Sequence, residues 1–471
     1  MTLPSDKRPE SDGLPVPQRW LAMAATVLGV GMSVLDASIT NVALPTIARE
    51  LQVDAAAVIW VANAYQLVTA ACIVALAGLS DLAGYRRVFL WGMSVFTLGS
   101  LACALSPSLP LLVASRLVQG LGAAALMAVT PALYRIIYPA SMLGRALGVS
   151  ALTVAASATC GPMVGGLILA FLPWPWLFAV NLPLGLLALW AAYRNLPANV
   201  CRKEPFDAAG AILAATAMGC FVIALDGLSK AYPAPLLWLL WAASGLAGFA
   251  FVQWQRAATH PLLPLTLFHS ARFSLAAATS TCSFVSQGLA FVTLPFLFQG
   301  AYGYTPFMSG LLFTPWPLTI VICAPLAGRL ADRISPPLVS TVGLAVLATG
   351  LATMAGLGAS ATVADIVWRA SICGCGFGLF QSPNNRELLG NAPRHLLGAA
   401  SGVLGSARTF GLSIGVAVAA VVVGVPGLDQ AAGVVKVPVQ RVDLSLWLAC
   451  GAAGTAFLVS ALRLGRTGRT P

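Results

Sequence analysis

Charged side chains are scarce in this sequence. Only 9% of its 471 residues are charged, whereas 58% are hydrophobic, and the mean hydropathy is +0.86. A water-soluble domain of this length could not cover its surface with so few charges. The composition therefore excludes an ordinary soluble fold and predicts a polytopic membrane protein.

Histidine is rarer still, and cysteine is not clustered. The histidines are His260, His269 and His395, and the ten cysteines form no Cys-X-X-Cys pair and no Cys/His group with the spacing of metal ligands. The sequence also has no HExxH motif, no nucleophile elbow and no phosphate-binding glycine loop. We therefore expect no metal site, no disulfide framework and no enzymatic activity.

Long apolar runs are abundant. About fourteen windows are long enough to cross a hydrocarbon core of about 30 Å as helices. The alternating pattern of membrane β-strands is absent. The first window starts near Trp20 and is too long for the apolar core of a signal peptide, so we expect an uncleaved first span in an all-α protein.

Basic residues fall mainly on one side of the predicted spans. If both termini face the cytoplasm, the outer loops hold only Arg49, Lys230, Lys436 and Arg441. The positive-inside rule favours this orientation, and we expect a multi-pass protein of the inner membrane. The net charge of +11 then arises from short loops beside an anionic leaflet and does not indicate nucleic-acid binding.

A weak internal repeat divides the predicted spans into two halves. The stretch GLSDLAGYRR, Gly78–Arg87, recurs as GRLADRIS, Gly328–Ser335. Repeats of this kind build many secondary transporters around a central site. The predicted parts are a cytoplasmic tail over 1–19, a six-helix half over 20–195, an inserted two-helix hairpin over 206–255, a second six-helix half over 271–462 and a cytoplasmic tail over 463–471.

Seven short stretches, in order along the chain, carry a family resemblance. They are LDASITNVALP, WVANAYQL, SDLAGYRR, RLVQGLGAA, GPMVGG, WLFAVNLPLG and HPLLPLTLF. Over nearly its whole length the chain resembles the fourteen-span drug:proton antiporters of the major facilitator superfamily. The resemblance implies a major facilitator-like fold with two six-helix halves, the hairpin inserted between them, and multidrug efflux that uses a proton gradient and no other cofactor.

One carboxylate, Asp36, interrupts an uncharged stretch of the first span. An acid at bilayer depth costs roughly 2.5 to 3.5 kcal/mol on insertion scales, so a partner or a role should offset it. At 1.5 Å per residue from the predicted outer ends of their spans, Asp36 and Arg116 both lie roughly 10 to 14 Å below the outer surface. They could therefore face each other or share a water-filled cavity.

Two interpretations of Asp36 stay open. Asp36 and Arg116 could form a buried ion pair that only fixes helix register. Alternatively, the protonation of Asp36 responds to desolvation and to a nearby cation, so that it exchanges a proton for a cationic substrate. The resemblance adds that an arginine at the position of Arg116 assists proton movement.

Close-packing residues mark two further spans. Small residues let helices approach closely in lipid, and proline removes one helical hydrogen bond. Packing alone would explain these residues, whereas the resemblance implies an antiporter motif in the fifth span. The residues are Gly120, next to Gln119 in the fourth span, and Gly148, Gly161, Pro162, Gly165 and Gly166 in the fifth.

The loop after the second span is short and turn-forming. Asp81 is expected near the inner N-terminus of the third span, where the helix dipole favours a negative charge. An ordinary tight turn with positive-inside residues would have the same composition. The resemblance instead implies a cytoplasmic latch that biases the conformational switch, made of Asp81, Gly84, Arg86 and Arg87 and, in the second copy, Gly328, Asp332 and Arg333.

The remaining candidates carry weaker signals. Asp226 and Asp365 lie near outer span ends, where interfacial charges are common, and Asp365 precedes Arg369 by one helical turn. Arg408, within GSARTFG, resembles a family arginine of unclear duty. Aromatic rings either pack or offer cation–π contacts to a lipophilic cation. The candidate cavity residues are Trp60, Tyr65, Gln119, Phe284 and Phe291.

The sequence thus predicts a monomeric, proton-coupled exporter of lipophilic cationic drugs or toxic compounds that works by alternating access. Its partners would be the small-molecule substrate, protons and the lipid bilayer. Export of one endogenous metabolite, such as an amino acid, antibiotic or siderophore, stays an alternative because specificity depends on cavity shape. A channel suits two repeated halves less well than alternating access does, and a membrane enzyme lacks its motifs.

Overall fold

The computed structural model describes residues 13–139, 142–197, 207–229, 232–259, 261–358, 361–393, 396–424 and 439–464. Within these ranges all regular secondary structure is helical, and fourteen helical segments are long and apolar enough to cross a membrane. This confirms the predicted all-α fold with fourteen spans.

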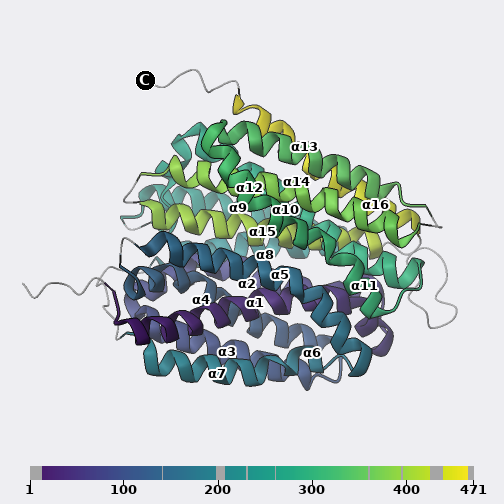
Figure 1. Ribbon diagram of the computed structural model, residues 1–471, viewed down its shortest axis with the longest axis horizontal. Helices are drawn as coiled ribbons and strands as arrows, with labels where there is room; N and C mark the ends of the chain where they lie inside the picture. Colours follow the sequence, from purple (N-terminus) through teal and green to yellow (C-terminus); the bar gives the residue numbers. More distant parts are fainter. Residues whose placement is uncertain are drawn as a thin grey trace, which may run out of the picture.

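The first half of the chain forms one helical bundle, drawn in the lower part of Figure 1. α1 packs against α5 and α7, and α4 packs against α2 and α3. Buried aromatic and aliphatic side chains, among them Phe89, Phe96 and Leu126, fill the space between these helices. The bounds are α1 (Val16–Glu50), α2 (Ala55–Ala83), α3 (Tyr85–Ala104), α4 (Leu109–Ile137), α5 (Leu143–Phe171), α6 (Trp176–Ala179) and α7 (Asn181–Asn195).

α1 is longer than the apolar pattern predicts. The sequence places the outer end of the first span near Pro45, but Pro45 lies inside the helix, which continues to Glu50. A proline inside a helix removes one backbone hydrogen bond, yet helices of membrane proteins tolerate this where neighbouring groups compensate. The outer end of α1 therefore projects beyond the apolar window.

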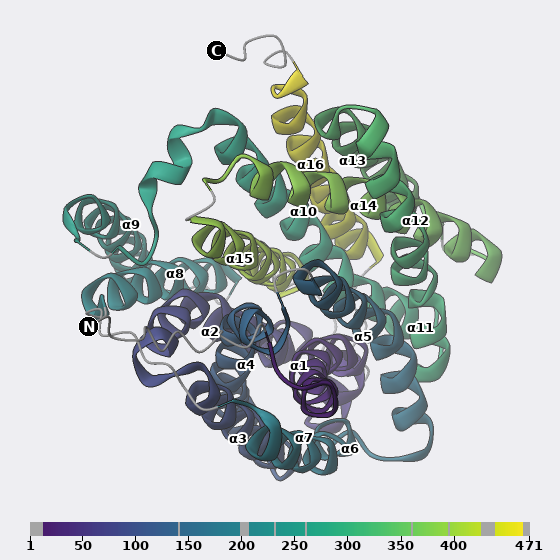
Figure 2. The ribbon, with the colours of Figure 1, turned by 60° about the vertical axis from the view of Figure 1, so that its left-hand side comes forward.

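The inserted hairpin consists of α8 (Ala208–Ser229) and α9 (Ala234–Ala257). α8 contacts α2 and α15, whereas α9 contacts mainly α8. Figure 2 shows the pair at the edge of the molecule, beside α2 and α15. α9 turns large apolar side chains outward, including Trp238, Leu239, Leu246 and Phe249. Such a surface suits contact with lipid.

The second half repeats the bundle, with one helix broken. The predicted tenth span is two helices that meet at Thr314, because Pro315 and Pro317 follow it and lack backbone N–H groups. α14 packs against α12 and α13, and α10 packs against α15 and α16. The bounds are η2 (Leu265–His269), α10 (Ala271–Phe296), η3 (Leu297–Ala301), α11 (Pro306–Phe313), α12 (Pro315–Arg333), α13 (Pro336–Ala355), α14 (Val363–Gly390), α15 (Leu397–Gly424) and α16 (Val439–Ala461).

The two halves meet mainly along two helix pairs, α2 with α15 and α5 with α11. We call the end of the molecule with the α2–α3 and α12–α13 connections the inner end, and the opposite end the outer end. At the outer end the halves are tightly packed. Gln299 of η3 donates its side-chain N–H to the carbonyl oxygen of Val42 in α1 at 2.8 Å. Leu44, Ile47 and Phe298 belong to one apolar cluster there.

A polar cluster is buried in the second half near the inner end. Arg463 donates to Glu387 Oε2 and to Asn384 Oδ1, at 2.8 Å each. The Asn384 side chain donates in turn to Ser280 Oγ at 2.8 Å. Arg463, assigned by the sequence to the tail over 463–471, is fully buried, and 465–471 lie outside the described residues.

Candidate functional site

The structure brings Asp36 and Arg116 together inside the first half. Arg116 Nη1 on α4 donates to Asp36 Oδ2 on α1, and the side chains are 0% and 1% exposed. The other carboxylate oxygen accepts N–H groups from Gln119 at 3.0 Å and from Asn181 of α7 at 2.7 Å. Two helices, α4 and α7, therefore supply three donors to one carboxylate, and both of its oxygens are hydrogen-bonded.

Arg116 is held from several sides as well. Its Nε donates to the carbonyl oxygen of Val61 at 2.9 Å, and Nη1 also donates to Gln119 Oε1 at 2.5 Å. Its Cζ lies 4.3 Å from the ring centroid of Tyr65 and 5.5 Å from that of Phe178. Arg116 Nη2 has no hydrogen-bond partner within the described residues. The ion pair is thus buried, and its two charges balance each other. One donor, Arg116 Nη2, stays without a partner among the described residues.

Two glycines make this close approach possible. A Cβ on Gly99 of α3 would lie 2.8 Å from the Gln119 Cα, and a Cβ on Gly120 would lie 2.7 Å from the carbonyl oxygen of Tyr65. Backbone cannot move away from such contacts without a shift of the whole helix. The glycine in RLVQGLGAA therefore serves the packing that positions Gln119 and Arg116.

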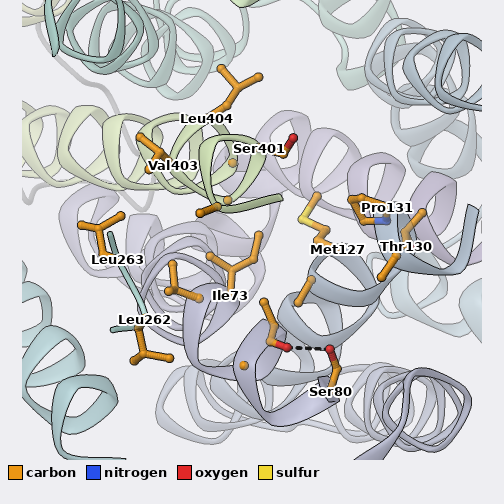
Figure 3. Close-up of a pocket in the computed structure, with 18 of the residues that line it drawn as sticks. Ile73, Ser80, Met127, Thr130, Pro131, Leu262, Leu263, Ser401, Val403 and Leu404 are labelled. Atoms are coloured by element: carbon orange, nitrogen blue, oxygen red, sulfur yellow. Dashed lines mark hydrogen bonds between the residues drawn. The ribbon is translucent and has the colours of Figure 1, made fainter. Parts of the chain in front are cut away.

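A cavity of about 900 Å³ lies between the halves and extends to the inner end. Figure 3 shows its apolar lining, with Ile73 from α2, Met127 from α4, and Val403 and Leu404 from α15. Its charged lining residues are Asp81, Arg135, Asp207 and Arg408. The described conformation is therefore open at the inner end and closed at the outer end.

A second pocket of about 100 Å³ continues this cavity toward the outer end, and we call it the deep pocket. The two share Met127, Arg408 and Thr409 as lining residues. The polar side chains of the deep pocket are those of Ser33, Ser38, Asn41, Tyr65, Gln66, Thr69, Gln287, Arg408 and Thr409.

The candidate cavity residues separate into two groups. Tyr65 and Phe291 line the deep pocket and Phe284 lines the large cavity. Gln119 lines neither space; its side-chain N–H donates to Asp36 instead. Trp60 does not line them either, and its indole N–H donates to Asp226 Oδ1 of the hairpin at 2.5 Å. Asp226 is 2% exposed, and it is buried where α8 packs against α2.

α1 lies between the deep pocket and the buried ion pair of Asp36. Ser33, Ala37 and Asn41 follow one another at intervals of four residues and line the pocket. The side chain of Asp36 projects from the same two turns in another direction, toward α4 and α7. The buried ion pair and the deep pocket therefore lie on different sides of one helix.

The GPMVGG stretch packs α5 against both halves. The Cβ positions of Gly161 and Gly165 would meet Ser38 and Ile39 of α1, and that of Gly166 would lie 2.9 Å from the Cα of Phe307 in α11. The carbonyl of Pro162 contacts Gly310 of α11 so closely that no Cβ fits there. Gly148 lies in the first turns of α5, where the surroundings of the side chains are outside the described structure.

The α2–α3 connection differs in one respect from the sequence prediction. Asp81 lies in the last turn of α2, not at the start of the third span, because α2 continues to Ala83 and α3 begins at Tyr85. Asp81 accepts the hydroxyl of Tyr85. Gly84 joins the helices with φ +91°, a conformation that favours glycine. Arg86 donates to the carbonyl oxygen of Tyr193 at 2.6 Å.

The second copy of this connection has a different partner. Asp332 near the end of α12 forms an ion pair with Arg386 of α14, and both side chains are exposed. A Cβ on Gly328 would lie 3.3 Å from Ser382 Oγ of α14. Arg333 and Arg87 form no hydrogen bond or ion pair within the described residues. Each copy therefore ties its own half together at the inner end.

The outer-end candidates in α14 have local structural roles. Thr362 and Asp365 form a capping box, in which Asp365 Oδ2 accepts the backbone N–H of Thr362 at 3.1 Å. Arg369 lies over the ring of Trp368, with its Cζ 4.9 Å from the centroid. Thr362 and Asp365 cap the first turn of α14, and neither Asp365 nor Arg369 lines the cavity.

Sequence reasoning missed two residues of the polar cluster around Asp36, one that binds Asp36 itself and one that binds its partner Gln119. Asn181 donates to the carboxylate from α7, and Ser100 Oγ of α3 accepts from Gln119 Nε2 at 2.8 Å. The signal for Asn181 lies in WLFAVNLPLG, where one amide interrupts an apolar run at the start of a span. A polar residue in such a run should have a partner at the same depth.

Two helical halves around a cavity that reaches one end define a membrane transporter, not an enzyme. The chain belongs to the Major Facilitator Superfamily, which matches residues 26–416. The uncharacterized transporter YebQ of Escherichia coli (strain K12) is 44% identical over 413 residues, which cover 87% of this chain and 90% of that protein. Multidrug resistance protein Stp of Mycobacterium tuberculosis is 36% identical over 437 residues, which cover 89% and 80%. The resemblance drawn from the sequence, to fourteen-span drug transporters of this superfamily, is thereby confirmed.

A solved structure shares the architecture. A POT family transporter in complex with a thioalcohol-conjugated peptide aligns with a TM-score of 0.70 over 95% of both chains, at 14% sequence identity. At this identity the likeness shows the fold alone. The two-halved arrangement seen here is therefore that of a known transporter fold.

Proposed function

We propose that this transporter exports small lipophilic molecules from the cytoplasm in exchange for protons. The observation that carries the proposal is the buried carboxylate of Asp36, which three donors from α4 and α7 hold inside the first half. An ionised carboxyl group is costly to maintain at this depth without partners. The charge of Asp36 therefore depends on whether its partners stay in contact with it. Such a group can bind a proton in one conformation and lose it in another.

Alternating access supplies the two conformations. In the described state the cavity extends to the inner end, which we propose faces the cytoplasm of an inner-membrane protein with both termini inside. Here both oxygens of Asp36 accept hydrogen bonds, from Arg116, Gln119 and Asn181. A movement of α1 or α4 that separates Asp36 from Arg116 would leave two buried charges unpaired, and a proton on Asp36 would relieve one of them. Outward opening is the state in which we expect that proton to bind.

The residues that line the cavity bear on which substrate the protein binds. The sequence favours a lipophilic cation, and this stays a prediction, since the two carboxylates that line the cavity, Asp81 and Asp207, both lie at its inner mouth. A single endogenous metabolite is the second candidate. The amides of Asn41, Gln66 and Gln287 in the deep pocket favour it, because directional polar groups select more strongly than a smooth apolar wall does.

The test has two stages. Cells that express the protein are screened for exclusion of lipophilic cations, neutral compounds and anions, with and without a protonophore. A compound whose exclusion needs the proton gradient is then used with proteoliposomes that contain a pH-sensitive dye. Wild-type protein should move protons only when this substrate is present.

The variant that tests the mechanism is Asp36→Asn, which keeps size and removes the titratable group. It should abolish substrate-coupled proton flux and leave membrane insertion intact. Asp54→Asn is the matched control, because Asp54 caps α2 at the outer end and asparagine caps equally well. Full proton-coupled transport by Asp36→Asn would reject the role of Asp36, and substrate flux without any pH gradient would indicate a channel.

A further inference from the structure

The guanidinium of Arg408 has no partner among the described residues. It belongs to α15 and lines both the large cavity and the deep pocket. Within the described part of the chain it forms no hydrogen bond and no ion pair. It lies nine residues beyond Ala399, where the apolar span begins, which is about 14 Å at 1.5 Å per residue and so near the middle of the bilayer. An unpaired arginine at this depth is costly and marks a functional site.

In the part of the chain that the structure describes, no carboxylate that lines either space, and not Asp36 either, pairs with Arg408. Asp36 is committed to Arg116, Gln119 and Asn181 on the far side of α1. Asp81 accepts the Tyr85 hydroxyl at the inner mouth of the cavity. Arg408 is the one charged residue among those that line the deep pocket.

Asp207 is engaged as well, at the same mouth. Its carboxylate accepts N–H groups from Gly210, Trp254 and Gln255 at 2.6 to 2.8 Å. The charge that the deep pocket offers to a ligand is therefore positive.

Three amide side chains surround the same space. Asn41 of α1, Gln66 of α2 and Gln287 of α10 line the deep pocket, and none forms a side-chain hydrogen bond within the described residues. Amides and hydroxyls that are left unsatisfied in a concave site are groups that a ligand can satisfy. Each amide offers two N–H donors, and arginine offers a planar fork of donors that matches a carboxylate. The pocket is thus rich in donors around one positive charge.

We propose that the deep pocket binds the anionic headgroup of an amphipathic substrate, with Arg408 as its counter-charge. A pocket of about 100 Å³ has room for a carboxylate, and the adjoining cavity of about 900 Å³ receives the apolar body of the molecule along Ile73, Met127, Val403 and Leu404. The substrate class is therefore an organic acid with an apolar body, opposite in charge to the lipophilic cation that the sequence favours. This inference rests on the proposed export function for its biological meaning.

The experiment compares three probes that share one ring system and differ in charge: 2-naphthoate, 2-naphthylmethanol and 2-naphthylmethylammonium. Each is titrated calorimetrically into the purified full-length protein in lipid nanodiscs, without a pH gradient. Wild-type protein should bind naphthoate about tenfold more tightly than the alcohol, which is the gain of one charge-assisted hydrogen-bonding pair. The ammonium should bind more weakly than the alcohol.

Variants assign the preference to Arg408. Arg408→Met should bind naphthoate no more tightly than the alcohol, whereas Arg408→Lys, which keeps the charge but loses the fork, should keep part of the preference. Arg135→Met is the matched control, because it removes a positive charge from the mouth of the cavity and not from the deep pocket. It should keep the preference within about twofold, since a charge at the mouth is screened by water.

The proposal is overturned if wild-type protein prefers the ammonium, shows no preference or does not bind naphthoate, or if Arg408→Met keeps the tenfold preference. Gel filtration checks that each variant is folded. Should Arg408→Met fail this check, Arg408→Lys decides: a loss of preference of about threefold or more supports the site, and an unchanged preference rejects it. Because these titrations need no proton gradient, a failure of proton coupling leaves their outcome readable.

Discussion

The guanidinium of Arg116 lies over the ring of Tyr65, with 4.3 Å between its Cζ and the ring centroid. Tyr65 also lines the deep pocket, and its hydroxyl donates to the carbonyl oxygen of Ser33 at 2.9 Å. A single side chain of α2 thus contacts the buried ion pair, the backbone of α1 and the space proposed for the substrate. If the proposed exchange of substrate for protons holds, the two can influence each other through Tyr65 without contact.

The first prediction separates the ring of Tyr65 from its hydroxyl. Tyr65→Leu removes the cation–π contact with Arg116, which is worth about 2 kcal/mol in a desolvated site, so proton-coupled transport should fall by about tenfold or more. Tyr65→Phe keeps the ring and loses one neutral hydrogen bond, so its rate should stay within about threefold of wild type. The measurement is the initial transport rate in proteoliposomes. A wild-type rate for Tyr65→Leu would show that Tyr65 does not couple the two sites.

The second prediction concerns the contact between the halves at Gly310. A side chain there would collide with the carbonyl of Pro162 in α5, so Gly310→Val should disfavour the described conformation, in which the outer end is closed. A cysteine introduced at Thr46, which is 5% exposed in that closed end, should then react faster with a membrane-impermeant maleimide added from outside. The transport rate should fall by about tenfold or more, because one of the two states is lost.

The matched control for this variant is Gly451→Val in α16. A Cβ on Gly451 meets no atom within 4 Å, so the added side chain should enter open space. The labelling of Thr46→Cys should not change in this background. Equal labelling in the Gly310→Val and Gly451→Val backgrounds would mean that the α5–α11 contact does not hold the outer end closed.

Much of the fold can be predicted from the sequence, because span length and loop charge reflect the bilayer directly. Counting residues from the predicted span ends gives Asp36 and Arg116 similar depths, and the structure brings the two together, although α1 ends at Glu50 and not near Pro45. The direction in which their side chains point cannot be predicted by counting residues. Asp36 points into the first half because Arg116, Gln119 and Asn181 converge there, and that convergence depends on how three helices rotate about their axes.

The apolar pattern also fails to predict where some helices end. α14 continues beyond its apolar window to Gly390, which brings Asn384 and Glu387 into the bundle. Arg463 follows the end of α16 and closes the same cluster. The sequence predicts a loop and a tail for these residues because they are polar. They are nevertheless buried, because they form hydrogen bonds and an ion pair with one another. A hydropathy window cannot detect a polar pair that is buried in this way.

The third prediction tests this cluster. Glu387→Gln leaves the fully buried Arg463 without a counter-charge, and the expected loss of stability is about 3 to 5 kcal/mol. Arg463→Met should cost a similar amount, whereas Glu387→Leu combined with Arg463→Met should recover much of it, since no buried charge is then left unpaired. Thermal inactivation of the purified protein measures each variant in a double-mutant cycle.

The exposed ion pair between Asp332 and Arg386 provides the reference cycle. Its side chains are 61% and 55% exposed, so the coupling energy should be about 1 kcal/mol or less. Equal coupling energies in the two cycles would contradict the structural role assigned to Glu387 and Arg463.

The fourth prediction concerns pH and the inner end of the hairpin. Burial alone would raise the pKa of Asp207, but the hydrogen bonds from Gly210, Trp254 and Gln255 outweigh it, and the pKa is lowered from its ordinary value of 3.8. A carboxyl group with a lowered pKa in the folded state stabilises the protein fully above its ordinary pKa. That contribution is lost as the pH falls through the lowered pKa.

Asp207→Asn should therefore unfold at a lower temperature than wild type at pH 7, by about 2 °C. The difference should shrink below about pH 4 and vanish at lower pH, where the wild-type carboxyl group is also neutral. Asp332→Asn is the control, because its exposed partner adds little stability at any pH. A gap between wild type and Asp207→Asn that stays constant from pH 7 to pH 3 would show that charge on Asp207 does not hold the hairpin in place.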